Sequence, residues 1–313
     1  MRTRESATDG WDSPEETLAT AAWEKTVEDA LDRQDQITLG EQVWGSSWGI
    51  RALDKHLLLQ PGKSYVVGGI KKGGKTLFTL STLIHNLAKV PPVNCGLFAL
   101  EMSRQEIAGK VLSHVAKIDS RKIFTPYMQD RELDVLRKHA ETVKLFPFHV
   151  DDRTGLSCEE IFERISDWKE VYEIPDDEFI VAVDFLQLID LDRQKGENEA
   201  SALRRTAYDL ACVAKETRCA IIATAQLNNQ AENNLPHIKY LEGSGGIAQC
   251  AEAILLLDLK HRRDSRYLNE GSSKSLDLIV AAQRTGESDV VIHCKADLRI
   301  GRFAAVEKGP VNG

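Results

Sequence analysis

The stretch GGIKKGGKT, residues 68–76, decides the fold class of this 313-residue chain. It lies between an apolar run, SYVVGG, and an amphipathic run, KTLFTLSTLIHNLA. Gly69, Gly74, Lys75 and Thr76 have the spacing Gly-x-x-x-x-Gly-Lys-Thr of a phosphate-binding loop. Glycines such as Gly73 let successive backbone amides turn toward one anion, and the start of a helix adds partial positive charge. The stretch therefore predicts a site for a nucleoside triphosphate.

Two residues of this loop have separate predicted roles. We expect Lys75 to contact the β- and γ-phosphates and Thr76 to bind Mg²⁺. Asp184 ends the apolar run FIVAVDF, and a carboxylate at that strand end holds Mg²⁺ through water in such sites. The predicted cofactors are thus ATP and Mg²⁺.

Two further polar residues end apolar runs that are typical of buried strands. Glu101 closes CGLFALE and is predicted to activate the attacking water as a general base. Gln226 closes CAIIATAQ and is predicted to sense the γ-phosphate or orient water. The alternative for each of these residues is a polar side chain that ends a strand and faces water. The alternative for the loop is a glycine-rich turn before a helix.

Composition limits the other classes of function. The chain is 42% hydrophobic and has a net charge of −8, which argues against a protein that coats nucleic acid but leaves a local basic channel open. We find no apolar run of about 18 residues and no signal-peptide core at residues 1–15, so the sequence predicts a cytoplasmic protein without a membrane span. The six cysteines have no metal-like spacing, so we expect reduced thiols.

The order of apolar and amphipathic runs predicts two parts. Residues 46–313 alternate strands with helices, which is typical of an α/β domain with a mostly parallel central sheet flanked by helices. Residues 1–45 are expected to contain a disordered start and a short helical extension. This helix begins with a capping box at 13–16, and its narrow apolar stripe consists of Ala19, Trp23, Val27 and Leu31. The stripe either packs on its own domain or links to a neighbouring subunit.

Five blocks in a fixed order carry a resemblance to a known family. They are FALEMS, FIVAVDFLQLI, AIIATAQLN, GSGGIAQCAEAILLLD and AAQRTG. Over about residues 46–305 the chain resembles the RecA-like motor domain of DnaB-type replicative helicases, which are P-loop NTPases. We do not expect the family's separate N-terminal helical domain in the roughly 45 residues that precede this region.

The resemblance implies an assembly and a set of partners. It implies a ring of identical subunits, usually a hexamer, with ATP at the subunit interfaces. Arg284 in AAQRTG would then insert into the ATP site of the neighbouring subunit. The implied partners are single-stranded DNA and a loader or another replication protein.

The chain departs from the family at two positions. The family often has a lysine two residues before the inserted arginine, where this chain has Ala282, and Lys71 and Lys72 are candidates to replace part of that charge. The family's arginine before Ser-Gly, which contacts the DNA backbone, is Glu242 here. Candidate replacements for the DNA contact are Lys195, His237, Lys239 and the basic run at 260–266.

These observations leave two functions open. The first is an ATP-hydrolysing ring motor that translocates on single-stranded DNA and unwinds duplex DNA. The second is a RecA-fold ATPase that acts as a protein-binding assembly switch without helicase activity. The five blocks favour the motor, whereas Glu242 and the acidic composition favour the switch. A recombinase filament fits the blocks less well.

Overall fold

The computed structural model describes residues 23, 25–32, 34–35, 44–190, 198–241, 244–262, 266 and 271–306. The chain divides into two units, Met1–Trp44 and Gly45–Gly313. In the first unit the described residues 23, 25–32 and 34–35 are helical. Trp23, Val27 and Leu31 of the predicted stripe are 66%, 41% and 61% exposed, whereas Ala19 and the capping box lie outside the described residues.

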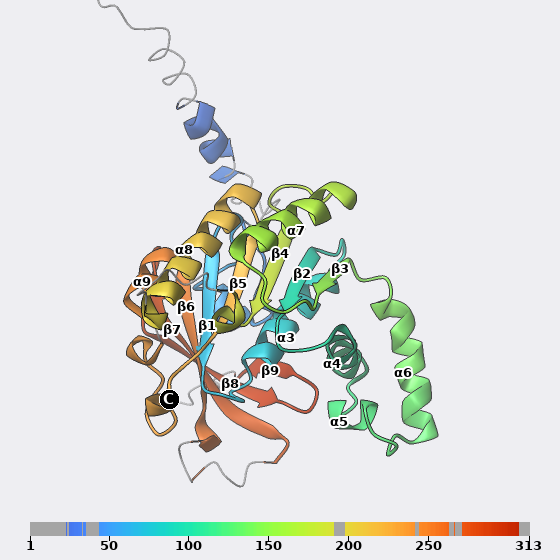
Figure 1. Cartoon of the computed structure of the whole chain (residues 1–313). Helices are drawn as coiled ribbons and strands as arrows, with labels where there is room; N and C mark the ends of the chain where they lie inside the picture. The colour runs from blue at the N-terminus through green and yellow to red at the C-terminus, as the bar shows by residue number, and fades with distance from the viewer. Residues whose placement is uncertain are drawn as a thin grey trace, which may run out of the picture. The chain divides into compact units, whose positions relative to one another are not determined.

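The second unit is built on a twisted sheet (Figure 1). In the part of the chain that the structure describes, nine strands pair in the order β3-β2-β4-β5-β1-β6-β7-β8-β9. The pairs from β3 to β6 are parallel, and those from β6 to β9 are antiparallel. The strands are β1 (Ser64–Gly69), β2 (Asn94–Ala99), β3 (Phe148–Asp151), β4 (Phe179–Asp184), β5 (Ala220–Gln226), β6 (Ala253–Leu259), β7 (Ser273–Gln283), β8 (Val290–Asp297) and β9 (Arg302–Ala305).

Helices cover both faces of the sheet. The α-helices are α2 (Arg51–Asp54), α3 (Lys75–Leu87), α4 (Arg104–Ala116), α5 (Ser120–Ile123), α6 (Asp130–Val143), α7 (Cys158–Val171), α8 (Glu199–Thr217) and α9 (Ser244–Cys250). Short 3₁₀ turns are η1 (Leu186–Leu188), η2 (Asn229–Ala231), η3 (Ile238–Tyr240) and η4 (Lys260–Arg262). This is the predicted mixed α/β architecture, with a mostly parallel sheet between helices.

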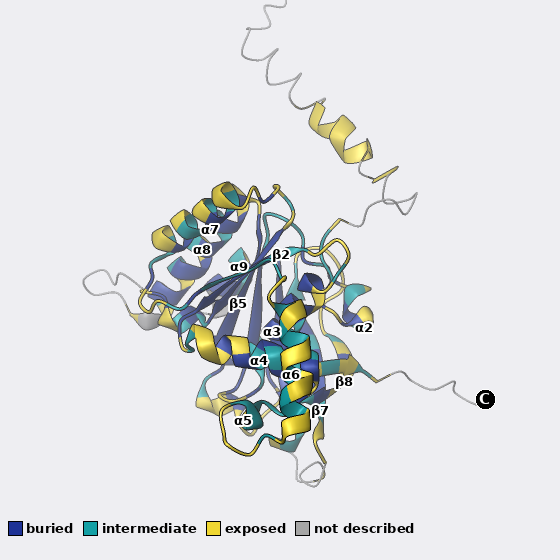
Figure 2. Ribbon diagram, turned by 90° about the vertical axis from the view of Figure 1, so that its right-hand side faces the viewer, coloured by how far each residue is buried: buried dark blue, intermediate teal, exposed yellow. Residues whose placement is uncertain are grey.

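The burial of the strands explains why their sequences are continuously apolar. Every residue of β1 and β4 is buried, because helices pack on both faces of these central strands. One core cluster joins the sheet to α3 and α4, and a second joins it to α7, α8 and α9. The buried strands therefore lie between two layers of helices whose outer faces are exposed (Figure 2). No helix among the described residues is long and apolar enough to cross a membrane.

An aromatic cluster fixes the position of α3, the helix that follows the phosphate-binding loop. Phe78 is 1% exposed. Its ring stacks on Trp48 at a centroid distance of 6.0 Å and meets Phe303 of β9 edge-on at 5.4 Å. Such pairs add to the free energy of burial. Phe78 therefore ties the start of α3 to segments at both ends of the unit.

We expect Phe78→Ala to lower the free energy of unfolding by about 3–5 kcal/mol, since it leaves a cavity between two aromatic rings. Urea unfolding followed by circular dichroism measures this change. Leu145→Ala is the matched control because Leu145 is 81% exposed, and it should change stability by less than about 0.5 kcal/mol. Equal midpoints for the two variants would contradict the role given to Phe78.

Candidate nucleotide site

A cavity of about 410 Å³ lies at the carboxyl ends of β1, β2, β4 and β5. This volume is in the range of small-molecule sites in proteins. The cavity lies where parallel strands end, which is the usual ligand position in such sheets. The residues that line it are Lys71, Lys72, Gly73, Gly74, Lys75, Thr76, Leu77, Glu101, Met102, Lys110, Asp184, Phe185, Gln226 and Leu298. Of the predicted site residues, Gly69 and Arg284 alone are not in this lining.

The phosphate-binding loop turns sharply between β1 and α3. Lys72 and Gly74 have φ values of 57° and 88°, in the left-handed region. A Cβ atom at Gly73 would approach the carbonyl oxygen of Ile70 to 2.7 Å, so the loop has no room for a side chain there. These conformations turn the loop backbone around the start of α3, where helix amides favour an anion.

Lys75 lies within this loop. Its Nζ atom donates to the carbonyl oxygens of Gly69 and Ile70, both at 3.1 Å. Burial lowers the pKa of the Lys75 ammonium, while the negative charges of Asp184 and Glu101 act in the opposite direction. Lys75 is therefore a partly buried cation that has both predicted carboxylates within electrostatic reach.

Asp184 is the buried acid of the site, with only 4% of its surface exposed. One carboxylate oxygen accepts a hydrogen bond from Thr76 Oγ1 at 2.7 Å, and the other accepts one from Thr224 Oγ1 at 2.5 Å. The two residues predicted to hold Mg²⁺ thus lie in direct contact. Hydroxyl and carboxylate oxygens are the ligands that Mg²⁺ prefers, so this pair fits the ion.

No cluster of three or more His, Cys, Asp or Glu residues that could hold a metal exists among the described residues.

Glu101 and Gln226 approach the same cavity from neighbouring parts of the sheet. Glu101 follows β2 and is exposed, so its carboxylate is accessible to water. Gln226 is the last residue of β5 and is partly buried. β4 lies between β2 and β5 and carries Asp184 at its own end. The strand order therefore brings all three polar ends to one cavity.

The structure adds two residues that the sequence patterns did not single out. Thr224 precedes Gln226 by two positions on β5, and the alternation of side chains along a strand is the signal that could have found it. Lys110 lies on α4, and its place in the cavity depends on how that helix packs, which no local pattern specifies. Lys110, Lys71 and Lys72 each form no ion pair with a described residue. The cavity therefore has an excess of positive charge that suits a triphosphate.

Arg284 lies at the opposite edge of the sheet. β7 runs antiparallel to β6, so its last residue, Gln283, pairs with Ala253 at the start of β6. The Arg284 amide donates to the Glu252 carbonyl at 2.9 Å, and its guanidinium donates to the carbonyls of Gln249 and Cys250. The full length of β1, about 20 Å, separates this edge from the phosphate-binding loop. Arg284 therefore does not belong to the nucleotide cavity of its own chain.

The remaining sequence candidates are scattered. Ala282 is partly buried and pairs with Ile254. Because alanine is uncharged, this position supplies no counterpart of the family's lysine. Lys239 lies over the ring of Tyr240 at 5.0 Å, and its amide donates to His237 Nδ1 at 3.0 Å. Glu242 and Lys195 lie outside the described residues, as does part of the basic run at 260–266.

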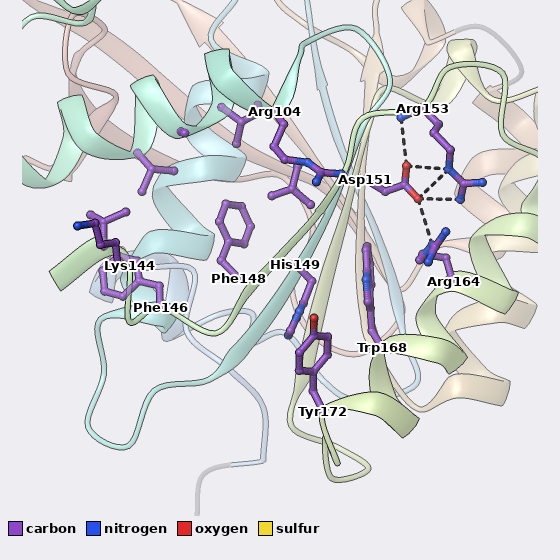
Figure 3. Close-up of a pocket in the computed structure, with 15 residues that line it drawn as sticks. Arg104, Lys144, Phe146, Phe148, His149, Asp151, Arg153, Arg164, Trp168 and Tyr172 are labelled. Atoms are coloured by element: carbon purple, nitrogen blue, oxygen red, sulfur yellow. Dashed lines mark hydrogen bonds and ion pairs between the residues drawn. The ribbon is translucent and has the colours of Figure 1, made fainter. Parts of the chain in front are cut away.

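A larger cavity, of about 600 Å³, lies beside the edge strand β3 and contains none of the predicted site residues (Figure 3). The His149 ring contacts the rings of Trp168 and Tyr172, at centroid distances of 5.8 and 4.3 Å. Asp151 accepts hydrogen bonds from Arg153 and forms an ion pair with Arg164 at 3.2 Å. Volume alone therefore does not identify the nucleotide site.

Comparison with known proteins agrees with this geometry. The family described as DnaB-like helicase C terminal domain matches residues 45–304. The chain belongs to this family.

The chain is 28% identical over 241 residues to the probable replicative DNA helicase of Trieres chinensis, which covers 76% of this chain and 52% of the relative. It is 27% identical over 300 residues to the replicative DNA helicase DnaB of Rickettsia typhi, with 87% and 59% covered. The chain thus spans little more than half the length of these relatives.

Two solved structures have the same fold. The ATPase domain of G40P superposes with a TM-score of 0.77 at 20% identity and covers 95% of this chain and 100% of that one. A DnaB-like replicative helicase, whose structure was solved to describe its interactions with primase, gives a TM-score of 0.76 at 22% identity and covers 90% and 66%. The RecA-like fold predicted from the sequence is confirmed.

We expect Glu101→Gln to bind ATP with near-normal affinity and to hydrolyse it at least about 10²-fold more slowly, because the amide cannot accept the proton of the attacking water. Steady-state phosphate release and equilibrium nucleotide binding measure the two effects. Lys75→Ala is the companion variant and should lose both binding and turnover. Hydrolysis by Glu101→Gln at the rate of the unmodified protein would assign the base to another group.

Proposed function

We propose that this protein is an ATP-hydrolysing motor that assembles into a hexameric ring, translocates on single-stranded DNA and unwinds duplex DNA. One observation carries the proposal: in a member of the DnaB-like family, the nucleotide cavity and Arg284 lie at opposite edges of one sheet. A subunit of this kind offers its arginine to a neighbour and not to itself. Its complete site then needs two subunits.

Each residue of the cavity has a role in the proposed reaction. Bound Mg²⁺ would neutralise charge on the β- and γ-phosphates. Thr76 and Asp184 would hold the ion, and Lys75 would bind the phosphates after leaving the carbonyl oxygens of Gly69 and Ile70. Glu101 would take the proton of the attacking water.

The contact with DNA is proposed for the segment between β5 and α9. Residues 228–241 begin two positions after Gln226 and include Lys239 and His237. A lysine there contacts phosphates without reading sequence, which suits a motor that must pass over any base. A replication protein that loads the ring is a further proposed partner, and the cytoplasm is the proposed location.

The test of this function is ATP hydrolysis with and without single-stranded DNA, followed by displacement of a labelled strand from a forked duplex. We expect DNA to stimulate hydrolysis and the ATP-driven displacement to fail in Lys75→Ala. If DNA does not change the rate of ATP hydrolysis and the labelled strand is not displaced, the motor hypothesis is wrong and the protein-binding switch remains.

We expect Arg284→Ala to lower ATP turnover by about 10³-fold or more, because an inserted arginine neutralises charge that develops on the γ-phosphate. Mixing this variant with Lys75→Ala should restore part of the activity. Random mixing of equal amounts joins an intact loop to an intact arginine at roughly a quarter of the interfaces. Phosphate release by the mixture measures the recovery.

Arg137→Ala is the matched control, since Arg137 is an exposed arginine of α6 that forms an ion pair with its helix neighbour Asp134. It should leave turnover unchanged, since it keeps both Lys75 and Arg284. Full activity of Arg284→Ala, or no recovery in mixtures whose subunits are shown by labelling to exchange, would exclude the shared site.

A further inference from the structure

The last residues of β5, which lead to the nucleotide cavity, are not paired with β4. The parallel ladder between these strands runs from Ile180–Ala220 to Val183–Ala223 and stops there. β5 nevertheless continues to Gln226, which pairs with Gly69 of β1 on its other side. The backbone groups of Gln226 that face β4 therefore have no strand partner.

Two side chains replace the missing ladder. Thr224 Oγ1 donates to Asp184, as described above. Beyond it, Gln187 of η1 makes two hydrogen bonds to the backbone of Gln226: Oε1 accepts from the Gln226 amide at 3.2 Å, and Nε2 donates to the Gln226 carbonyl at 3.2 Å. We refer to these two bonds as the Gln187 bridge. A side-chain amide here imitates the donor and acceptor of a neighbouring strand.

The Gln187 bridge joins the acid strand of the site to the next segment of the chain. Gln187 lies three residues after Asp184 in the turn that follows β4. The residue after Gln226, Leu227, donates to Gly69 at 3.1 Å and forms an isolated bridge with Leu241. Asn228 donates to Tyr240 at 2.8 Å. Segment 228–241 therefore starts directly after Leu227, and its last residue, Leu241, pairs with Leu227.

We propose that Gln187 is a positioning residue that holds the backbone of Gln226, so that Gln226 faces the nucleotide cavity and its state is transmitted to segment 228–241. This inference rests on the proposed function for the DNA contact, but not for the geometry of the bridge. Without the bridge, the tip of β5 is held on the β1 side alone. Gln226 then points into the cavity for a smaller fraction of the time.

The chemistry of the side chain makes the inference testable. Gln187 is partly buried, so replacement must preserve its volume. Gln187→Met has a similar shape and makes neither hydrogen bond. Gln187→Glu can accept from the Gln226 amide, but its carboxylate faces the Gln226 carbonyl, which is a repulsive contact. Gln105→Met is the matched control, because Gln105 is an exposed glutamine of α4 outside the nucleotide cavity.

Hydrogen exchange of backbone amides tests the Gln187 bridge directly and does not depend on ATPase activity. We expect the Gln226 amide to exchange at least about tenfold faster in Gln187→Met than in the unmodified protein, while the amides of Val66 and Val67 in β1 stay unchanged. Gln105→Met should leave all of these rates unchanged. An unchanged Gln226 rate in Gln187→Met, or faster exchange throughout β1 and β5, would overturn the positioning role.

Steady-state ATPase kinetics then test the effect of the Gln187 bridge on hydrolysis. We expect Gln187→Met and Gln187→Glu to lower kcat for ATP by about tenfold with KM changed less than about threefold, and to reduce the stimulation by single-stranded DNA toward one. A loss confined to KM, or stimulation equal to that of the unmodified protein, would overturn the inference. If DNA does not stimulate the unmodified protein, the proposed motor function fails by itself, and exchange and basal kcat still decide the role of Gln187.

Discussion

A buried carboxylate that must be satisfied by hydroxyl groups is the constraint on which the site depends. Asp184 forms no ion pair with a described residue, and burying a charge without partners costs several kcal/mol. Its two oxygens accept from Thr76 and Thr224, which come from α3 and β5. These bonds join three segments that are distant in sequence. The position of the phosphate-binding loop relative to the sheet follows from them.

The elements around Asp184 were predictable because their signals are local. The glycine spacing at 69–76, the apolar runs that form β1, β2, β4 and β5, and the polar residues at the ends of the last three runs are all visible in short windows. Since the carboxyl ends of parallel strands meet at one edge, the strand direction places Glu101, Asp184 and Gln226 at that edge. The adjacency of β2, β4 and β5 then brings them to one cavity.

The sequence did not predict the placement of residues whose contacts lie far away along the chain. Lys110 reaches the cavity only through the packing of α4. Gln226, the partner of Gln187, lies 39 residues later in the sequence, and the contact depends on where the β4–β5 ladder stops. No periodicity encodes the length of a ladder between two strands. The edge on which Arg284 lies likewise depends on the antiparallel pairing of β7, which the apolar pattern of its sequence does not specify.

The cavity and Arg284 lie at opposite strand ends, so the folded chain has two different surfaces that can contact a neighbouring copy. Contacts that join one edge to the other are of the head-to-tail kind, in which each copy presents a different surface to its two neighbours. Such an array has a direction along its circumference, unlike one built from paired identical faces. In the proposed ring, a cycle of ATP hydrolysis that passes from subunit to subunit through these contacts would therefore have a direction around the ring.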